Sequence, residues 1–247
     1  MKSYVAVLGR QPLISVAELE SLFEDVKLLS PMLAMFRSET TPDIRRLGGT
    51  LKIATPIKLD EFFNSLPESG KITIGVSDFS KGTSAYVAQK EALKIKQRLK
   101  RAGRSARAVS NKDAILSSAT SIHNRLFTNS QVELIKNGRE WYRVLAVQDI
   151  SSYAQRDQGR PARDAKVGML PPKLAQILLN LCGDLPVGSR VLDPFCGTGV
   201  VLQEAALMGY VPYGTDLSER MVSYSQRNLK WLCINANGRQ HHETMRD

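Results

Sequence analysis

The sequence has 247 residues, enough for one large domain or for two to three small ones. Hydrophobic residues make up 43% of it and charged residues 23%, which is typical of a globular protein. The sequence has no apolar run of the roughly 18 residues that a membrane span needs, and its three scattered cysteines exclude a disulfide framework and a cysteine zinc site. We therefore expect a cytoplasmic protein with no membrane contact and no metal centre.

The net charge of +10 is concentrated in the middle of the chain. Between Lys81 and Lys166 there are 18 Lys and Arg residues against 7 Asp and Glu, whereas the rest is nearly balanced. A solvated helix face would explain part of this excess, but a whole basic segment is typical of a module that binds a polyanion. The residues that we expect to contact RNA phosphates are Lys94, Arg98, Arg101, Arg104, Arg107, Lys112, Arg125, Arg156, Arg160 and Arg163.

The first 58 residues have the hydrophobic pattern of a small α+β domain. Strands and helices alternate in the order β-α-β-β-α-β, which is that of a ferredoxin-like domain, a scaffold with many unrelated uses. The elements are expected at residues 2–9, 14–23, 26–30, 33–36, 43–47 and 51–57.

Residues 59–150 are predicted to form a second domain that carries most of the basic side chains. Its elements are a helix at 59–63, a strand at 71–77, a helix at 86–101, a strand at 104–109, a helix at 117–127, and strands at 131–135 and 141–150. This segment resembles a THUMP domain, in Leu116-Ser117-Ser118-Ala119 after Arg107-Ala108-Val109-Ser110, in Glu133-Leu134 and in Val147-Gln148-Asp149-Ile150. The resemblance implies an RNA-binding module that recognises the single-stranded acceptor end of tRNA.

The connector at residues 151–168 alternates Arg and Asp with Gly and Pro. Such a composition predicts a polar linker with little to bury. The alternative is a connector that lies against RNA or folds back on the pocket of the next domain.

The stretch from Asp193 to Gly199 predicts a nucleotide site. It follows the buried strand end Val191-Leu192, precedes a helical pattern at 200–208, and is succeeded by a strand at 210–215 that ends in Asp216. Glycines in the turn let backbone N–H groups approach a ligand, and the acid accepts hydrogen bonds from a ribose diol. A tight turn that binds nothing is the alternative, and the spacing does not fit the dinucleotide fingerprint of an oxidoreductase.

Asp193-Pro194-Phe195-Cys196-Gly197-Thr198-Gly199 resembles motif I of class I S-adenosylmethionine-dependent methyltransferases, in the variant of RNA and DNA amino-methyltransferases. The connector and the following Gly168-Met169-Leu170-Pro171-Pro172 resemble the junction in THUMP-class tRNA guanosine-10 N2-methyltransferases of archaea and eukaryotes. The resemblance implies S-adenosylmethionine as cofactor and methyl transfer to the exocyclic amine of a tRNA guanosine. The cofactor residues that it implies are Asp193, Pro194, Phe195, Cys196, Gly197, Thr198, Gly199, Asp216, Leu217, Leu170 and Pro172.

The family's Asp/Asn-Pro-Pro-Tyr/Phe motif does not occur in this sequence, so no catalytic residue is assigned. The predicted fold is a ferredoxin-like plus THUMP-like half, α+β in class, joined to an incomplete α/β Rossmann-like domain at 169–247. We expect a C-terminally truncated chain that is inactive alone and leaves one side of the Val191 strand open. The alternatives are a non-catalytic tRNA-binding protein and one half of a split methyltransferase completed by a second chain.

Overall fold

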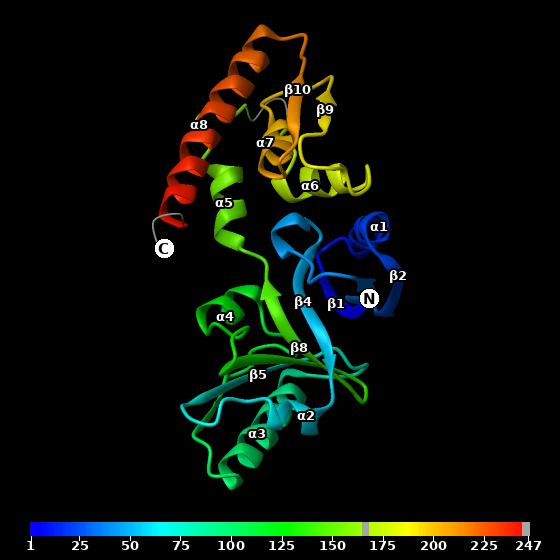
Figure 1. The fold of residues 1–247 in the computed structure, drawn as a ribbon, viewed down its shortest axis with the longest axis vertical. Helices are drawn as coiled ribbons and strands as arrows, with labels where there is room; N and C mark the ends of the chain where they lie inside the picture. Colours follow the sequence, from blue (N-terminus) through cyan, green and yellow to red (C-terminus); the bar gives the residue numbers. More distant parts are fainter. Residues whose placement is uncertain (165–167, 244–247) are drawn as a thin grey trace. The chain divides into compact units, whose positions relative to one another are not determined.

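A computed structural model describes residues 1–164 and 168–243, with side chains described up to Cys233. The chain forms two compact units (Figure 1). The first contains Met1–Arg45 and Gly49–Ile150, and the second contains Arg46–Gly48 and the chain from Ser151 onward. None of the described helices is both long and apolar enough to cross a membrane.

One eight-stranded sheet runs through the first unit, in the order β2-β3-β1-β4-β8-β7-β5-β6. Its strands are β1 (Lys2–Leu8), β2 (Glu24–Ser30), β3 (Leu33–Ser38), β4 (Thr50–Ile57), β5 (Ile72–Asp78), β6 (Ala106–Ala108), β7 (Gln131–Asn137) and β8 (Glu140–Val147). The helices are α1 (Pro12–Leu22), α2 (Leu59–Asn64), α3 (Ala85–Arg101) and α4 (Ser118–His123), with a 3-10 turn at Ile44–Arg46.

The strands β2-β3-β1-β4 are antiparallel and have the order of a ferredoxin-like sheet. The helix expected at 43–47 is only the single 3-10 turn. On its other side β4 pairs antiparallel with β8, with Thr55 opposite Arg143. One core cluster therefore includes Val5 and Ala54 from the first predicted domain and Val144 from the second. The two predicted domains share a sheet, and their division at residue 58 stays a prediction.

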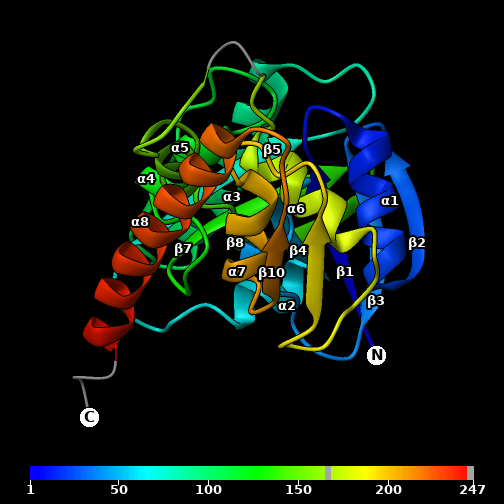
Figure 2. The same ribbon diagram turned by 90° about the horizontal axis from the view of Figure 1, so that it is seen from above.

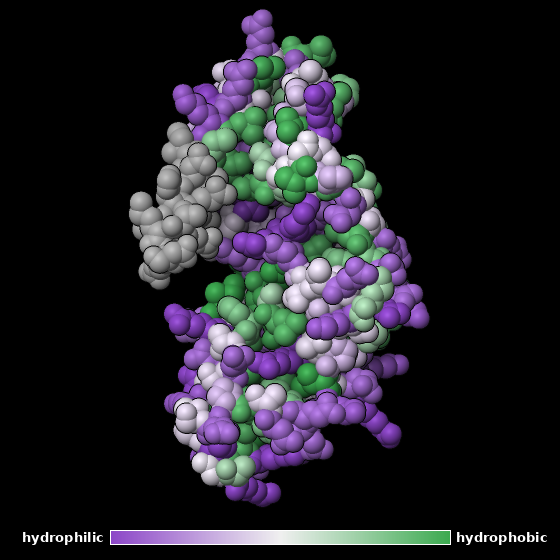
Figure 3. All heavy atoms as spheres, in the orientation of Figure 1, coloured by the Kyte–Doolittle hydropathy of each residue, from purple (hydrophilic) through white to green (hydrophobic). Residues whose placement is uncertain are grey.

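Helix α3 covers the β5–β6 part of the sheet because its apolar residues lie on one face. Ala88, Ala92, Ile95 and Leu99 are buried at helical spacing. The Ser84 hydroxyl accepts a hydrogen bond from the Val87 N–H at the start of the helix. Basic side chains occupy the last turn, where the helix dipole favours them. Hydrophilic residues accordingly predominate around α3, at the bottom of Figure 3.

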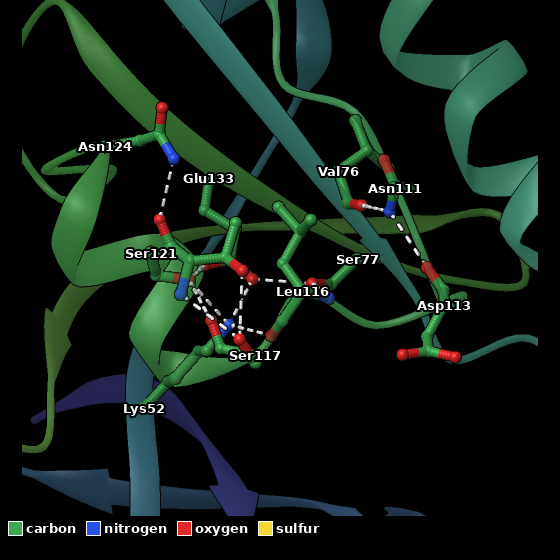
Figure 4. A network of polar contacts seen from close by, with 11 residues as sticks. Lys52, Val76, Ser77, Asn111, Asp113, Leu116, Ser117, Ser121, Asn124 and Glu133 are labelled. Carbon is green, nitrogen blue, oxygen red and sulfur yellow. Dashed lines mark hydrogen bonds and ion pairs between the residues drawn. The ribbon is translucent and has the colours of Figure 1, made fainter. Parts of the chain in front are cut away.

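Lys52 and Glu133 are buried together at the centre of this unit (Figure 4). The Lys52 Nζ lies 2.6 Å from Glu133 Oε1 and also donates to the Leu116 carbonyl and the Ser121 hydroxyl. The hydroxyls of Ser77 and Ser121 donate to the two Glu133 oxygens, each at 2.6 Å. Burial lowers the pKa of Lys52, and Glu133 opposes that shift. The network joins β4, β5 and β7 to helix α4 and to the loop before it.

Replacing Lys52 by methionine should lower the free energy of unfolding by about 3–5 kcal/mol, because Glu133 would remain buried without its counter-charge. Urea denaturation followed by circular dichroism measures the change. Lys58→Met is the control, since Lys58 and Glu61 form an exposed ion pair at 3.2 Å whose loss should change stability by less than about 1 kcal/mol. Equal effects of the two substitutions would contradict this account of the network.

The second unit contains a two-stranded parallel sheet flanked by helices. Its elements are α5 (Ile150–Gln158), α6 (Pro172–Asn180), β9 (Arg190–Asp193), α7 (Val200–Leu207), β10 (Val211–Gly214) and α8 (Glu219–Glu243). Helix α7 connects β9 to β10 and lies alongside both strands in Figures 1 and 2. Leu179, Ala205, Met208 and Tyr210 form the core between the sheet and the helices α6 and α7. This strand–helix–strand unit is the half of a nucleotide-binding sheet that the sequence predicted.

The connector differs from the polar linker that we expected. Its first half is helix α5, Tyr153 and Ala162 are buried, and the side chain of Arg160 is fully buried. The Arg156 guanidinium lies 2.7 Å from the buried Glu204 carboxylate of α7. The connector is therefore packed into the second unit against α7, and its contact with the cofactor pocket stays a prediction. Residues 165–167 of the predicted linker, and the last four residues of the predicted domain at 169–247, lie outside the described residues.

Candidate cofactor site and nucleic-acid interface

The carboxyl ends of β9 and β10 lie side by side, because the strands are parallel with Asp193 opposite Gly214. The Thr215 N–H donates to the Asp193 carbonyl at 3.0 Å, and the Cys196 N–H donates to the Thr215 carbonyl at 2.9 Å. The segment after β10 is thus fixed to the turn after β9. This is the edge at which open α/β sheets bind ligands.

Asp216 is bonded directly to the glycine turn. Its Oδ2 accepts the Gly197 N–H at 3.0 Å, and its Oδ1 accepts the Ser218 N–H at 2.9 Å. Each carboxylate oxygen has a second lone pair, so the group can accept two further hydrogen bonds from a ligand. Asp193 has a local role, since its Oδ1 accepts the Phe195 N–H at 3.1 Å and shapes the start of the turn.

The turn ends at Gly199, which precedes helix α7 and has a left-handed φ of 82°. A Cβ at this position would lie 2.8 Å from the Ser225 Cβ, so both conformation and space require glycine. No side chain caps the start of α7. Its first N–H groups therefore keep the partial positive charge that favours a polar or anionic ligand group.

Cys196 is buried within the turn. Burial raises the pKa of its thiol; Ser225 opposes the shift, and Asp193 and Asp216 add to it. A thiol with a raised pKa stays protonated at neutral pH. The buried Cys196 side chain contributes to the shape of the turn.

Apolar side chains are exposed beside the turn. Phe195 is 81% exposed and Leu217 is fully exposed, whereas Thr198 is buried and Pro194 lies on the surface. Pro172 is buried at the start of α6, and Leu170 is partly buried. The structure thus brings Asp193–Gly199 and Asp216 together, with Leu217 next to them, while the assignment of Leu170 and Pro172 to the cofactor stays a prediction.

A separate basic pocket of about 400 Å³ lies in the first unit. It is formed by the starts of β5 and β7, by β6 and by the end of α4. Its lining residues are Lys71, Thr73, Arg107, His123, Asn124, Arg125 and Gln131, with no acidic side chain among them. Only Arg107 and Arg125 were predicted from the sequence to contact RNA. The other lining residues could not be predicted from the local sequence, because the pairing of strands brings them together.

The remaining predicted RNA contacts fall into three groups. In the first group, Arg101, Lys112 and Arg163 are exposed. In the second group, the side chains are bonded to other parts of the protein: Arg98 pairs with Asp60, Lys94 pairs with Glu91, and Arg104 donates to the Pro67 carbonyl. Arg156 and Arg160 differ from the prediction, because they lie inside the second unit. Burial raises the pKa of Glu204, and Arg156 opposes that shift. The positive charge of Arg156, which we expected to bind a phosphate, therefore stabilises a buried carboxylate of the same unit.

Arg125 has a backbone conformation that glycine normally occupies. Its φ is 51°, and it follows Asn124, the C-cap residue of α4. The Leu126 N–H donates to the Ser121 carbonyl and the Arg125 N–H to the Ile122 carbonyl, which is the hydrogen-bond pattern of a Schellman helix end. Arg125 thus carries a strain of about 1–2 kcal/mol while its side chain lines the pocket.

Alanine substitutions at the two turn glycines should differ in their effect on stability. Gly197→Ala adds only the strain of a φ of 49°, about 1 kcal/mol, because no atom lies within 4 Å of the new Cβ. Gly199→Ala should lower the free energy of unfolding further, since it adds the clash with Ser225. Urea denaturation compares the two variants directly. A Gly199→Ala variant as stable as Gly197→Ala would contradict the packing described here.

Comparison with known proteins finds relatives of the second unit. Residues 160–240 match the family model of UPF0020, the RMKL-like methyltransferase domain. A tRNA (guanine(10)-N2)-dimethyltransferase of Methanothermobacter thermautotrophicus is 49% identical over 63 residues, which are 26% of this chain and 18% of that protein. The enzyme of the same name from Methanocaldococcus jannaschii is 39% identical over 87 residues, 35% of this chain and 24% of that protein. The matches therefore span less than a quarter of the length of these relatives.

A solved structure shares the fold over both units. The crystal structure of TrmN from Thermus thermophilus aligns with 96% of this chain and 70% of its own, with a TM-score of 0.50 and 18% sequence identity. The family that the Asp193–Gly199 motif predicted is confirmed by the family model over the residues containing that motif. Residues 160–240 of this chain are thus similar to an RMKL-like methyltransferase domain.

Proposed function

We propose that this chain supplies the cofactor site and the tRNA-binding part of an S-adenosylmethionine-dependent tRNA (guanine-N2) methyltransferase. The observation that carries the proposal is the bond from the Gly197 N–H to Asp216, at the carboxyl ends of two parallel strands. That bond lies within the segment that matches the methyltransferase domain and the tRNA (guanine(10)-N2)-dimethyltransferases. We also propose a cytoplasmic location, in keeping with a tRNA substrate.

The residues at the turn fit the cofactor. Asp216 has two acceptor positions left for the ribose hydroxyls, and the exposed Leu217 offers an apolar surface to the adenine. Asp193 and the turn through Gly199 would line the methionine end, where a Cβ built on Gly197 has no heavy atom within 4 Å. S-adenosylmethionine supplies the electrophilic methyl group.

The reaction is methyl transfer to the exocyclic amine of a guanosine. The nitrogen lone pair forms a bond to the methyl carbon as the carbon–sulfur bond breaks, and the amine proton leaves to solvent. Holding the amine in line with the methyl group supplies most of the rate enhancement. The contribution of the described residues is to bind and orient.

The basic pocket and the surface around it are proposed to hold the acceptor end of the tRNA. Lys71, Arg107 and Arg125 place three positive charges around one pocket that no acidic residue lines. Phosphate groups would release counterions on binding, so affinity should fall steeply with salt. A THUMP-like domain at residues 59–150 is the part of the chain to which we assign this role.

The second unit exposes an apolar sheet face. Leu192 is 66% exposed and Tyr213 opposite it is 48% exposed, and β9 pairs only with β10 among the strands of residues 1–164 and 168–243. We propose that further strands, supplied by a second chain, pair with the open edge of β9, and that helices connected to them cover this face. A tRNA-binding protein without catalysis is the other candidate, and it predicts that no partner binds this face.

Calorimetric titration with S-adenosylhomocysteine tests the cofactor site. The chain should bind, and Asp216→Ala should weaken binding by about tenfold to a hundredfold, because two hydrogen bonds to a charged acceptor are lost. Asp184→Ala, at an exposed acid before β9, is the control and should bind as the unaltered chain does. Equal affinity of the Asp216→Ala variant would exclude this role for Asp216.

Arg125→Gly tests the RNA interface. The substitution should raise the free energy of unfolding by up to about 1 kcal/mol, since glycine adopts a positive φ without strain. It should also weaken tRNA binding and reduce the salt dependence of the affinity by roughly one phosphate contact. Fluorescence anisotropy across a salt series and urea denaturation provide the two readouts.

Arg139→Gly is the charge-matched control for this experiment, because Arg139 is exposed in the β7–β8 turn and does not line the pocket. It should leave the salt dependence nearly unchanged. Unaltered tRNA binding by Arg125→Gly would show that the pocket does not hold RNA.

A further inference from the structure

Helix α8 carries a fully buried asparagine, Asn228, whose side chain bonds two segments far apart in the sequence. Its Oδ1 accepts the Ala162 N–H at 3.0 Å, and its Nδ2 donates to the Ala162 carbonyl at 2.9 Å. The same Nδ2 donates to the Thr198 carbonyl at 2.8 Å. One amide therefore joins the connector, the glycine turn and α8.

The bond to Thr198 fixes a peptide group of the cofactor turn from one side. The Thr198 carbonyl belongs to the same planar peptide group as the Gly199 N–H, which donates to the Cys196 carbonyl at 2.7 Å. This peptide plane is therefore held at both ends. Of these two hydrogen bonds, the one from Asn228 comes from outside the turn.

The two bonds to Ala162 hold the connector by its backbone. They satisfy both the N–H and the carbonyl of one residue, as a neighbouring strand would. A second attachment is the Arg156–Glu204 ion pair on α7. The Gln203 side chain of α7 also donates to the Asn228 main-chain carbonyl at 3.1 Å, which fixes α8 to α7 at this position.

A buried amide in the middle of a helix is unfavourable unless each polar atom has a partner. Leucine has a similar volume and would pack in such a place without needing partners. An asparagine here instead specifies one arrangement of the segments that it joins. Loss of its side chain would leave the buried Thr198 carbonyl without this donor.

We propose that Asn228 is a positioning residue of the cofactor site that couples the glycine turn to the connector. A cofactor on the turn then also orders the connector around Ala162. The inference rests on the proposed function, since it needs a cofactor at Asp193–Gly199. Cofactor binding at this site therefore also orders the connector, the segment that follows the first unit in the sequence.

The test combines calorimetry with hydrogen exchange measured by mass spectrometry on the full 247-residue chain. S-adenosylhomocysteine should slow exchange in peptides covering the connector at 160–164 and the turn at 196–200. Asn228→Ala should weaken its binding about tenfold, as expected for the loss of buried hydrogen bonds. At saturating ligand the variant should protect the turn but no longer the connector.

Asn180→Ala is the matched control, because Asn180 is also buried and donates through Nδ2 to the backbone carbonyl of Arg46. It should lower thermal stability yet keep the ligand affinity and the protection of the connector. A merely structural role for Asn228 predicts that both variants behave alike. Full protection of the connector in Asn228→Ala at saturating ligand would overturn the inference.

Failure of the proposed function is distinguishable from failure of this inference. No binding by the unaltered chain would refute the cofactor site. In that case Asn228→Ala should still accelerate exchange in both peptides without ligand, whereas Asn180→Ala should accelerate neither. Unchanged exchange in the turn peptide would refute the coupling itself.

Discussion

Two opposite charges, Lys52 and Glu133, are buried together in the first unit, and much of its architecture depends on satisfying them. Each ionised group loses its hydration on burial, so every remaining donor and acceptor must find a partner. The partners come from β4, β5, β7, the loop before α4 and α4 itself. Helix α4 is therefore held against the sheet by polar bonds as well as by packing, and its end presents His123 and Arg125 to the basic pocket.

Each candidate site contains a residue with left-handed backbone, but this conformation is unstrained in one site and strained in the other. At Gly199 the residue adopts φ 82° freely, and the missing side chain admits Ser225 against the turn. At Arg125 a comparable conformation carries a long charged side chain, and the Schellman bonds of α4 hold it there. The first site thus uses the backbone to approach a ligand, while the second uses backbone strain to direct a guanidinium.

Local periodicity was sufficient to locate most elements. The helix expected at 86–101 is α3 at Ala85–Arg101, because regularly spaced apolar residues precede a glycine stop. The meeting of Asp216 with the glycine turn was also predictable, since parallel strands end at one edge. The burial of Arg156 and Arg160 could not be predicted, because it depends on residues distant in the sequence, such as Glu204, the ion-pair partner of Arg156. The pocket around Lys71 and His123, and the role of Asn228, likewise depend on pairings without a local signature.

The pairing of β4 with β8 has a consequence for how the chain folds during synthesis. Lys52 lies opposite Val147, so the outer edge of the ferredoxin-like half stays uncovered until the ribosome has released nearly the whole first unit. Such long-range pairing makes folding slow and leaves an unpaired strand edge exposed in the nascent chain. An N-terminal fragment ending near residue 58 would keep that edge permanently, and is therefore a poor candidate for isolated expression.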